Sequence, residues 1–149
     1  MADAPDPDRL KLYSFSVFTQ LNGAVTAGMI HLGDKLGLYS ALAAADGPVT
    51  TVELAERTGL DERWVREWAY NQAAAKLIAV DTGAQAPGGE TFWLTPEATA
   101  VLASPDHPAF GMGMFHRFPQ TMAALCLLYT SDAADDTQVV WVWGGGGGW

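Results

Sequence analysis

The sequence has 149 residues, 49% of them hydrophobic and 17% charged, which is enough for one compact domain with a packed core. Eight Lys and Arg oppose 17 Asp and Glu, and this net charge of −9 argues against nucleic acid as the main partner, because phosphate binding needs a clustered basic surface. The single cysteine excludes a disulfide framework and a cysteine-based zinc site.

The chain begins with an acidic, proline-rich segment, unlike the basic start of a signal peptide. No apolar run reaches the length of a membrane span. We therefore expect a soluble, cytoplasmic protein with no membrane partner and with a disordered N-terminus over residues 1–8.

Residues 8–36 carry apolar side chains three or four positions apart, which predicts a long helix with Asp8 as its N-cap. The stripe consists of Phe15, Phe18, Leu21, Val25, Met29, Leu32 and Leu36. Asn22 and Gly23 leave open whether this is one helix or two. Burial in a dimer and packing on the domain's own core explain the apolar surplus equally well. A short continuation over residues 37–42 ends before the Asp-Gly-Pro stop at 46–48, so the N-terminal helices span residues 9–46.

A helix-turn-helix follows. Thr50 and Glu53 predict a capping box at the first helix, residues 58–60 the turn, and Asp61 the cap of the second helix. In the second helix, Trp64, Trp68 and Tyr70 are interpreted as buried packing residues.

Residues 77–80 and 91–94 are predicted strands, and the loop 81–90 between them is the wing. A helix over residues 95–103 follows, with Thr95 as N-cap, and residues 104–108 break the chain. The predicted fold is mainly α with a small β-hairpin. It is a winged helix-turn-helix over residues 47–104, with an added N-terminal helical dimerisation layer. Residues 105–125 form a linker and a helix, interrupted by Pro119, that lead to a missing catalytic domain.

Residues 126–149 have no helical or strand periodicity and end in five glycines and a tryptophan. Residues 126–135 resemble one reading frame of a transposase-type sequencing adaptor, and the Val, Trp and Gly codons after them suit a G-rich read. We interpret this segment as an artefactual tail and exclude it from the functional argument.

The charges of the second helix do not favour DNA. Its three bases face three acids, and the wing holds two acids and no base. The bases are Arg63, Arg66 and Lys76, and the acids are Asp61, Glu62 and Glu67.

The three histidines do not form a site. His31 is interpreted as a core or dimer-face residue and His107 as solvated. His116 lies among aromatic residues, so it either lines a pocket or is exposed on a helix. No residue is predicted to be catalytic, to bind a cofactor or to ligate a metal.

Residues 26–124 resemble the N-terminal domain of class I S-adenosylmethionine-dependent methyltransferases that begin with a winged helix. The matching segments are residues 33–42 with the run GDKLGLY, 53–68, 92–97 with the run FWLTPE, and 108–110. Lys76 departs from the pattern, because many relatives have glycine there before the wing strand.

The resemblance implies that this winged helix mediates dimerisation through the N-terminal helices and covers a small-molecule substrate. A separate α/β domain of the parent enzyme would bind S-adenosylmethionine. The fragment alone would bind no cofactor and would not be an enzyme. The alternative is a free-standing winged-helix transcriptional regulator that binds DNA.

Overall fold

The computed structural model describes residues 4–83 and 89–129. The chain divides into two compact units, one ending at Phe115 and the other beginning at His116. In chain order the elements are α1 (Pro7–Lys35), α2 (Leu38–Ala43), α3 (Thr51–Thr58), α4 (Glu62–Ala74), β1 (Ala79–Asp81), β2 (Thr91–Trp93), α5 (Pro96–Leu102), the 3-10 helix η1 (Met112–Met114) and α6 (Phe118–Tyr129).

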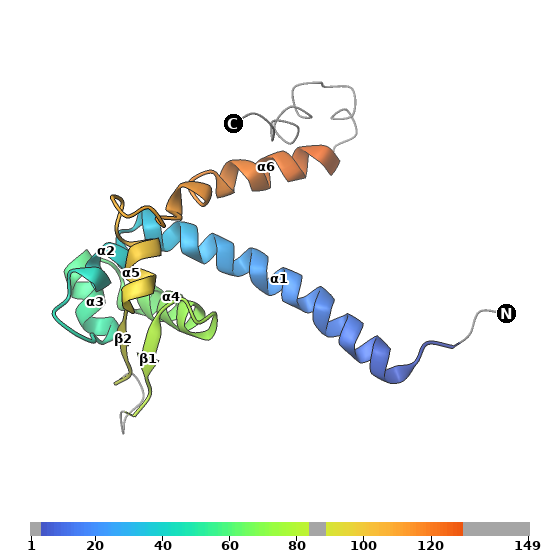
Figure 1. The fold of residues 1–149 in the computed structure, drawn as a ribbon, viewed down its shortest axis with the longest axis horizontal. Coiled ribbons are helices and arrows are strands. Elements are labelled where there is room, and N and C mark those ends of the chain that lie inside the picture. Colours follow the sequence, from blue (N-terminus) through green and yellow to red (C-terminus); the bar gives the residue numbers. More distant parts are fainter. Residues whose placement is uncertain (1–3, 84–88, 130–149) are drawn as a thin grey trace. The chain divides into compact units, whose positions relative to one another are not determined.

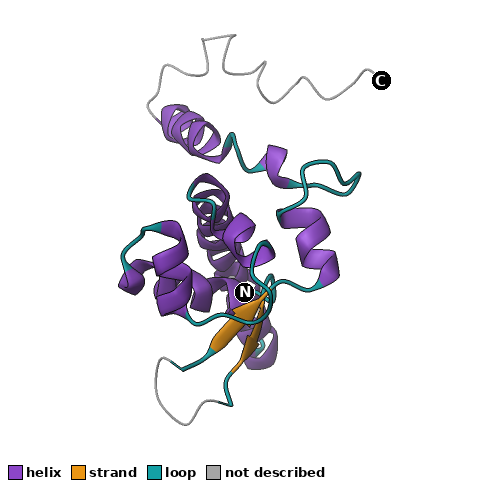
Figure 2. Cartoon of the chain, turned by 90° about the vertical axis from the view of Figure 1, so that its left-hand side faces the viewer, coloured by secondary structure: helices purple, strands orange, loops and turns teal. Residues whose placement is uncertain are grey.

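The predicted fold class is confirmed, because helices dominate and the two strands form an antiparallel hairpin (Figure 2). In the hairpin Val80 pairs with Phe92, and Val49 adds an isolated bridge on the other side of Phe92. Across residues 4–83 and 89–129, no helix combines the length and hydropathy that crossing a bilayer requires.

Helix α1 is one uninterrupted helix through Asn22 and Gly23 (Figure 1). It begins at Pro7, two residues before the predicted boundary at residue 9, and its N-cap is Asp6 rather than Asp8. The Asp6 carboxylate accepts from the backbone N–H groups of Asp8 and Arg9. The prediction was wrong here because a proline is compatible with a helix's first turn, where the backbone N–H has no helical partner.

The helix-turn-helix follows the predicted capping. Thr50 and Glu53 form a capping box at α3, and the Asp61 carboxylate caps α4. Gly59 ends α3 with a φ of 68°, in the left-handed region that suits glycine. Gly37 does the same between α1 and α2, so residues 38–43 are a separate helix rather than a continuation of α1.

Strand β1 begins at Ala79, later than the predicted start at residue 77. After α4, Lys76 takes a φ of 60°, and Ile78 is buried in the core before the hairpin begins. The left-handed backbone of Lys76 turns the chain out of α4. Leu77 and Ile78 therefore connect α4 to the hairpin and are not part of β1.

Helix α5 begins where predicted, with the Thr95 hydroxyl accepting from the Ala98 N–H. Beyond it, Pro119 lies in the first turn of α6 and does not interrupt that helix. Helix α6 extends to Tyr129, so residues 126–129 of the predicted tail are helical; the rest of that tail lies outside the described residues.

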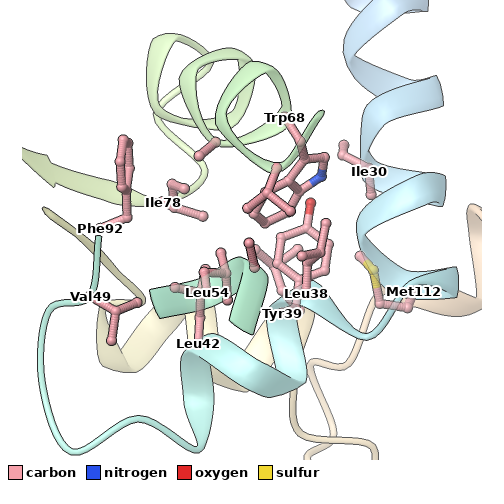
Figure 3. Close-up of a cluster of buried hydrophobic side chains, with 14 residues drawn as sticks. Ile30, Leu38, Tyr39, Leu42, Val49, Leu54, Trp68, Ile78, Phe92 and Met112 are labelled. Carbon is pink, nitrogen blue, oxygen red and sulfur yellow. The ribbon is translucent and has the colours of Figure 1, made fainter. Parts of the chain in front are cut away.

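The core of the first unit lies where α1 to α5, the hairpin and η1 meet (Figure 3). Leu38, Tyr39, Leu54, Trp68 and Phe92 are among its buried side chains. The rings of Tyr39 and Trp68 meet edge to face, with centroids 5.2 Å apart. Helix α1 joins this core with its C-terminal end, through Ile30 and Gly33.

Candidate functional site

The N-terminal part of α1 carries the most exposed apolar surface of the first unit. Every described residue before Thr26 is exposed. Eight large apolar side chains are between 53% and 72% exposed: Leu10, Leu12, Tyr13, Phe15, Val17, Phe18, Leu21 and Val25. A contiguous apolar surface of this kind marks an interaction site.

The C-terminal part of α1 is held by Trp68 of α4. The indole N–H donates to the carbonyl oxygen of Met29 at 3.0 Å. Gly33 lies against the same ring, because a Cβ built there would come within 2.7 Å of it. Trp68 thus holds α1 in two ways: by a hydrogen bond to Met29 and by close contact with the backbone at Gly33.

Beside Trp68 lies a groove of about 530 Å³, which we call the α1–α4 groove. It is lined by Met29, Leu32, Leu36, Arg63, Trp64, Glu67 and Trp68. Leu32 and Leu36 are each 46% exposed on its α1 side. The floor is therefore apolar, and the charges of Arg63 and Glu67 stand on the α4 side.

The sequence-based interpretation of Trp64 was wrong. Trp64 is 69% exposed, and the Arg63 guanidinium lies 5.9 Å from its ring centroid. Trp68, 3% exposed, is buried as predicted. Tyr70 is also exposed, although its ring lies against Phe92 and its hydroxyl donates to Glu90. Trp64 lies one turn before Trp68 on α4. The contacts with Met29 and Gly33 of α1 are made by Trp68, and the Trp64 ring remains exposed.

Helix α4, which would read DNA in a winged-helix regulator, has one of its basic side chains paired with an acid of the same helix. Arg66 forms an ion pair with Glu62 one turn earlier, and Glu62 also accepts from the Thr51 hydroxyl at 2.7 Å. The hydrogen bonds from Arg66 and Thr51 hold the pKa of Glu62 below its ordinary value, and the bond to Glu62 raises the pKa of Arg66. In the wing, residues 84–88 lie outside the described residues.

A second groove, of about 500 Å³, lies between the end of α4, β1 and α5; we call it the α4–α5 groove. Its lining includes Leu77, Ile78, Val101 and Leu102, with Lys76 and Glu97 among the charged residues. An apolar floor with a few charged groups suits a small organic molecule or an apolar protein surface.

The structure separates the three histidines. His31 is half-buried, and its Nδ1 donates to the carbonyl oxygen of Phe115 at 2.8 Å, so it links α1 to the end of η1. His107 is exposed, and its Nδ1 accepts from the Ala109 N–H within a turn. His116 is exposed and begins the second unit. Among the described residues, no cluster of three His, Cys, Asp or Glu side chains has metal-binding geometry.

The most buried polar contact is structural. The hydroxyl of Tyr39 donates to the side-chain carbonyl of Gln72, and both side chains are buried. Burial, followed by the charge of Asp34, raises the pKa of Tyr39 far above its ordinary value. A tyrosine that keeps its proton and faces the core ties α2 to α4.

The model of the Rv2258c-like winged helix-turn-helix domain family matches residues 24–104. A search of curated proteins finds no match. The matched span contains the C-terminal part of α1, the helix-turn-helix, the hairpin and α5. It begins close to the position at which α1 passes from its exposed to its packed part.

Solved structures with this fold include methyltransferases. Human N-acetylserotonin methyltransferase, in complex with SAM, matches 91% of the chain at 18% identity and a TM-score of 0.64, with 36% of the enzyme covered. The dimethyltransferase RosA from Streptomyces davawensis matches 80% at 28% identity and a TM-score of 0.53, with 32% covered. CalO1, a methyltransferase in calicheamicin biosynthesis bound to SAH, matches 74% at 27% identity and a TM-score of 0.53, with 30% covered.

In each case the chain spans about a third of the enzyme's length and corresponds to its N-terminal domain.

Proposed function

Because the chain belongs to the Rv2258c-like winged helix-turn-helix domain family, and because its fold matches the N-terminal domain of methyltransferases, we propose that it is the dimerisation and substrate-covering domain of such an enzyme. The catalytic domain of the parent enzyme would bind S-adenosylmethionine. The fragment by itself would bind no cofactor and transfer no methyl group. We place the parent enzyme in the cytoplasm and its substrate among small organic molecules.

The observation that carries this proposal is the exposed apolar surface of α1 over residues 7–25. An isolated helix of this length is marginal in water, and most helical stability in proteins comes from packing of an apolar face. This part of α1 also holds Ser14 and Thr19, whose hydroxyls bond to carbonyl oxygens one turn earlier and favour the helix little. A second copy of the chain supplies the missing packing surface.

The substrate-covering role is supported by the α4–α5 groove. Its residues come from the end of α4, β1 and α5, and none of them belongs to α1. The apolar lining gives a small aromatic or aliphatic substrate a surface to pack on. Lys76 and Glu97 give it two opposite charges for orientation.

The alternative function, a DNA-binding regulator, fits the charges less well. Arg66 is paired with Glu62, and Glu67 lies on the same helix as Arg63. An acid close to a phosphate opposes the electrostatic attraction that supplies most non-specific DNA affinity. The described residues of the wing include two acids, Asp81 and Glu90, which also disfavour contact with phosphates.

Light scattering during size exclusion tests the dimer. The full chain is expected to elute with the mass of a dimer, and the double variant Phe18→Glu/Leu21→Glu with the mass of a monomer, because four charges would be buried in the interface. The matched control Ser16→Glu, on the opposite side of α1, should remain dimeric. A monomeric wild-type chain, or a dimeric double variant, would overturn the proposed role of α1.

Two titrations separate the domain from its alternatives. Calorimetry with S-adenosylmethionine should give no binding heat, and a gel shift on mixed DNA at low salt should show no complex. Micromolar DNA binding that weakens steeply with salt would support the regulator instead.

A further inference from the structure

We propose that the α4–α5 groove binds a small apolar molecule that carries one anionic group, such as an aromatic carboxylate, and that the Lys76 ammonium holds its anionic end. The inference rests on the proposed substrate-covering role of this groove and names the class of molecule that it takes. Lys76 is the basic residue of the groove lining, and Glu97 is the acidic one.

Lys76 occupies a backbone position that favours glycine. The Leu77 N–H donates to the carbonyl oxygen of Gln72 at 2.9 Å. The Lys76 N–H donates to that of Ala73, also at 2.9 Å, and the two bonds form the Schellman pattern that ends α4. The residue between them takes a left-handed backbone, and Lys76 does so with a φ of 60°. Because a Cβ makes this conformation costly, the gain from lysine here lies in its side chain.

The Lys76 ammonium is available to a ligand. Lys76 is exposed, and within residues 4–83 and 89–129 its side chain forms neither an ion pair nor a hydrogen bond. It therefore brings an unneutralised positive charge to the lining of an apolar groove. An anionic group that enters the groove supplies the missing partner.

Glu97 has hydrogen-bond partners of its own at the start of α5. Its carboxylate accepts from its own backbone N–H and from the Thr95 hydroxyl, and these hydrogen bonds lower its pKa. Glu97 is therefore ionised at neutral pH and repels a second negative charge. The anionic end of a ligand then lies against Lys76 and away from Glu97, so the two charges fix its direction in the groove.

The rest of the groove accepts the apolar part of the ligand. Its lining includes Ile78 and Leu102, which belong to the core, and Val101, which is exposed. Ala73 of α4 and Ala98 of α5 also line it, and their short side chains leave space between the two helices. The volume of about 500 Å³ lies within the range of small-molecule sites.

The charge of the whole chain favours a local site over general attraction of anions. The formal net charge is −9, so the average surface repels a negatively charged molecule. An anion that binds this chain therefore depends on a particular cation and on the apolar contacts beside it. Lys76 in the α4–α5 groove provides both.

Titration calorimetry of the full chain with 2-naphthoate and with its uncharged analogue 2-naphthamide tests the inference. The two molecules share one apolar body and differ in charge. Naphthoate should bind about fivefold more tightly, which is the effect of one partly exposed ion pair. The difference should shrink at high salt, because salt screens such a pair.

Three lysine variants assign this preference to the groove. Lys76→Gly should weaken naphthoate binding by about fivefold and leave naphthamide binding unchanged. Glycine suits the left-handed backbone at this position, so unfolding does not explain the loss. Lys76→Arg should keep the preference because it keeps the charge. Lys35→Ala, which removes the same charge from the end of α1 outside the groove, is the matched control and should also keep it.

The outcomes separate this inference from the proposed function. An undiminished preference in Lys76→Gly, or an equal loss in Lys35→Ala, would overturn the inference and leave the substrate-covering role intact, because apolar contacts do not need Lys76. Failure of both compounds to bind would overturn the inference and also remove the support for the covering role. The dimer would still be decided by light scattering, which does not depend on the groove.

Discussion

The two parts of α1 share one apolar spacing but differ in environment. Residues 26–35 pack on α4, where Trp68 bonds to Met29 and Gly33 lies against the indole. Residues 7–25 carry larger apolar side chains, and all of them are exposed. Both parts follow the same spacing, so periodicity identifies the helix without indicating which part the chain itself covers.

The difference shows that α1 serves two surfaces. Its short C-terminal part belongs to the core of the winged helix, and its long N-terminal part is available to another molecule. The family match begins at residue 24, so the winged-helix family shares the packed part and little of the exposed part. Four sets of variants sharpen the comparison between packed and exposed positions, in order of decreasing expected effect.

The largest effect is expected from Trp68→Ala, which removes a buried ring and its hydrogen bond to Met29. The free energy of unfolding should fall by about 3–5 kcal/mol. Trp64→Ala, one turn earlier on the same helix, should change it by about 0.5 kcal/mol or less, because that ring is exposed. Urea unfolding followed by circular dichroism measures both. Equal losses would show that Trp64 is packed as tightly as Trp68.

Two glycines within α1 should respond with opposite signs. Gly33→Ala adds a methyl group against the Trp68 ring and should cost about 1–3 kcal/mol of unfolding free energy. At Gly23 an added Cβ meets no atom within 4 Å in the part of the chain that the structure describes, so Gly23→Ala should stabilise the helix by about 0.5–1 kcal/mol. Thermal unfolding of the two variants gives the comparison. A gain at Gly33 would refute the close contact.

The exit from α4 gives a smaller effect in the stabilising direction. Lys76 has a φ of 60°, which costs a residue with a Cβ about 1–2 kcal/mol. Lys76→Gly should raise the unfolding free energy by about 1 kcal/mol or less, because the flexible unfolded chain offsets part of the relieved strain. Lys76→Ala keeps the Cβ and is the control, with no gain expected. Urea unfolding midpoints of Lys76→Gly and Lys76→Ala, measured in parallel, show whether only the glycine variant is stabilised.

The smallest effect concerns pH. Hydrogen bonds from Arg66 and Thr51 hold the pKa of Glu62 below its ordinary value of 4.5 in the folded state. The ionised form is therefore favoured by folding, so this stabilisation is present at neutral pH and is lost as the pH falls through the lowered pKa. Glu62→Gln should lower the stability at pH 7 and have less effect near pH 3. A pH-independent difference from wild type would contradict this linkage.

Much of the winged helix could be predicted because its signals are local. The capping box of Thr50 and Glu53, the turn at Gly59 and the Thr95 cap each depend on residues within one turn of the chain. Asp6 was missed as the α1 cap because two prolines and three acids compete within a few residues. Lys76 stands where many relatives have glycine, and its left-handed φ explains why glycine suits this position.

The candidate interaction surfaces could not be predicted in the same way. Trp64 and Trp68 lie one turn apart on α4, and the contacts with Met29 and Gly33 of α1 are made by Trp68. The α4–α5 groove joins residues before and after the hairpin, so its existence depends on how β1 and β2 bring α5 back to α4.

The amino-acid order by itself determined which segments are helical, where most of them start and stop, and that the chain is a winged helix, because these properties follow from contacts between near neighbours. Tertiary structure alone decided which apolar side chains remain in solvent. Burial depends on how far a neighbouring element reaches, and α4 is too short to cover all of α1.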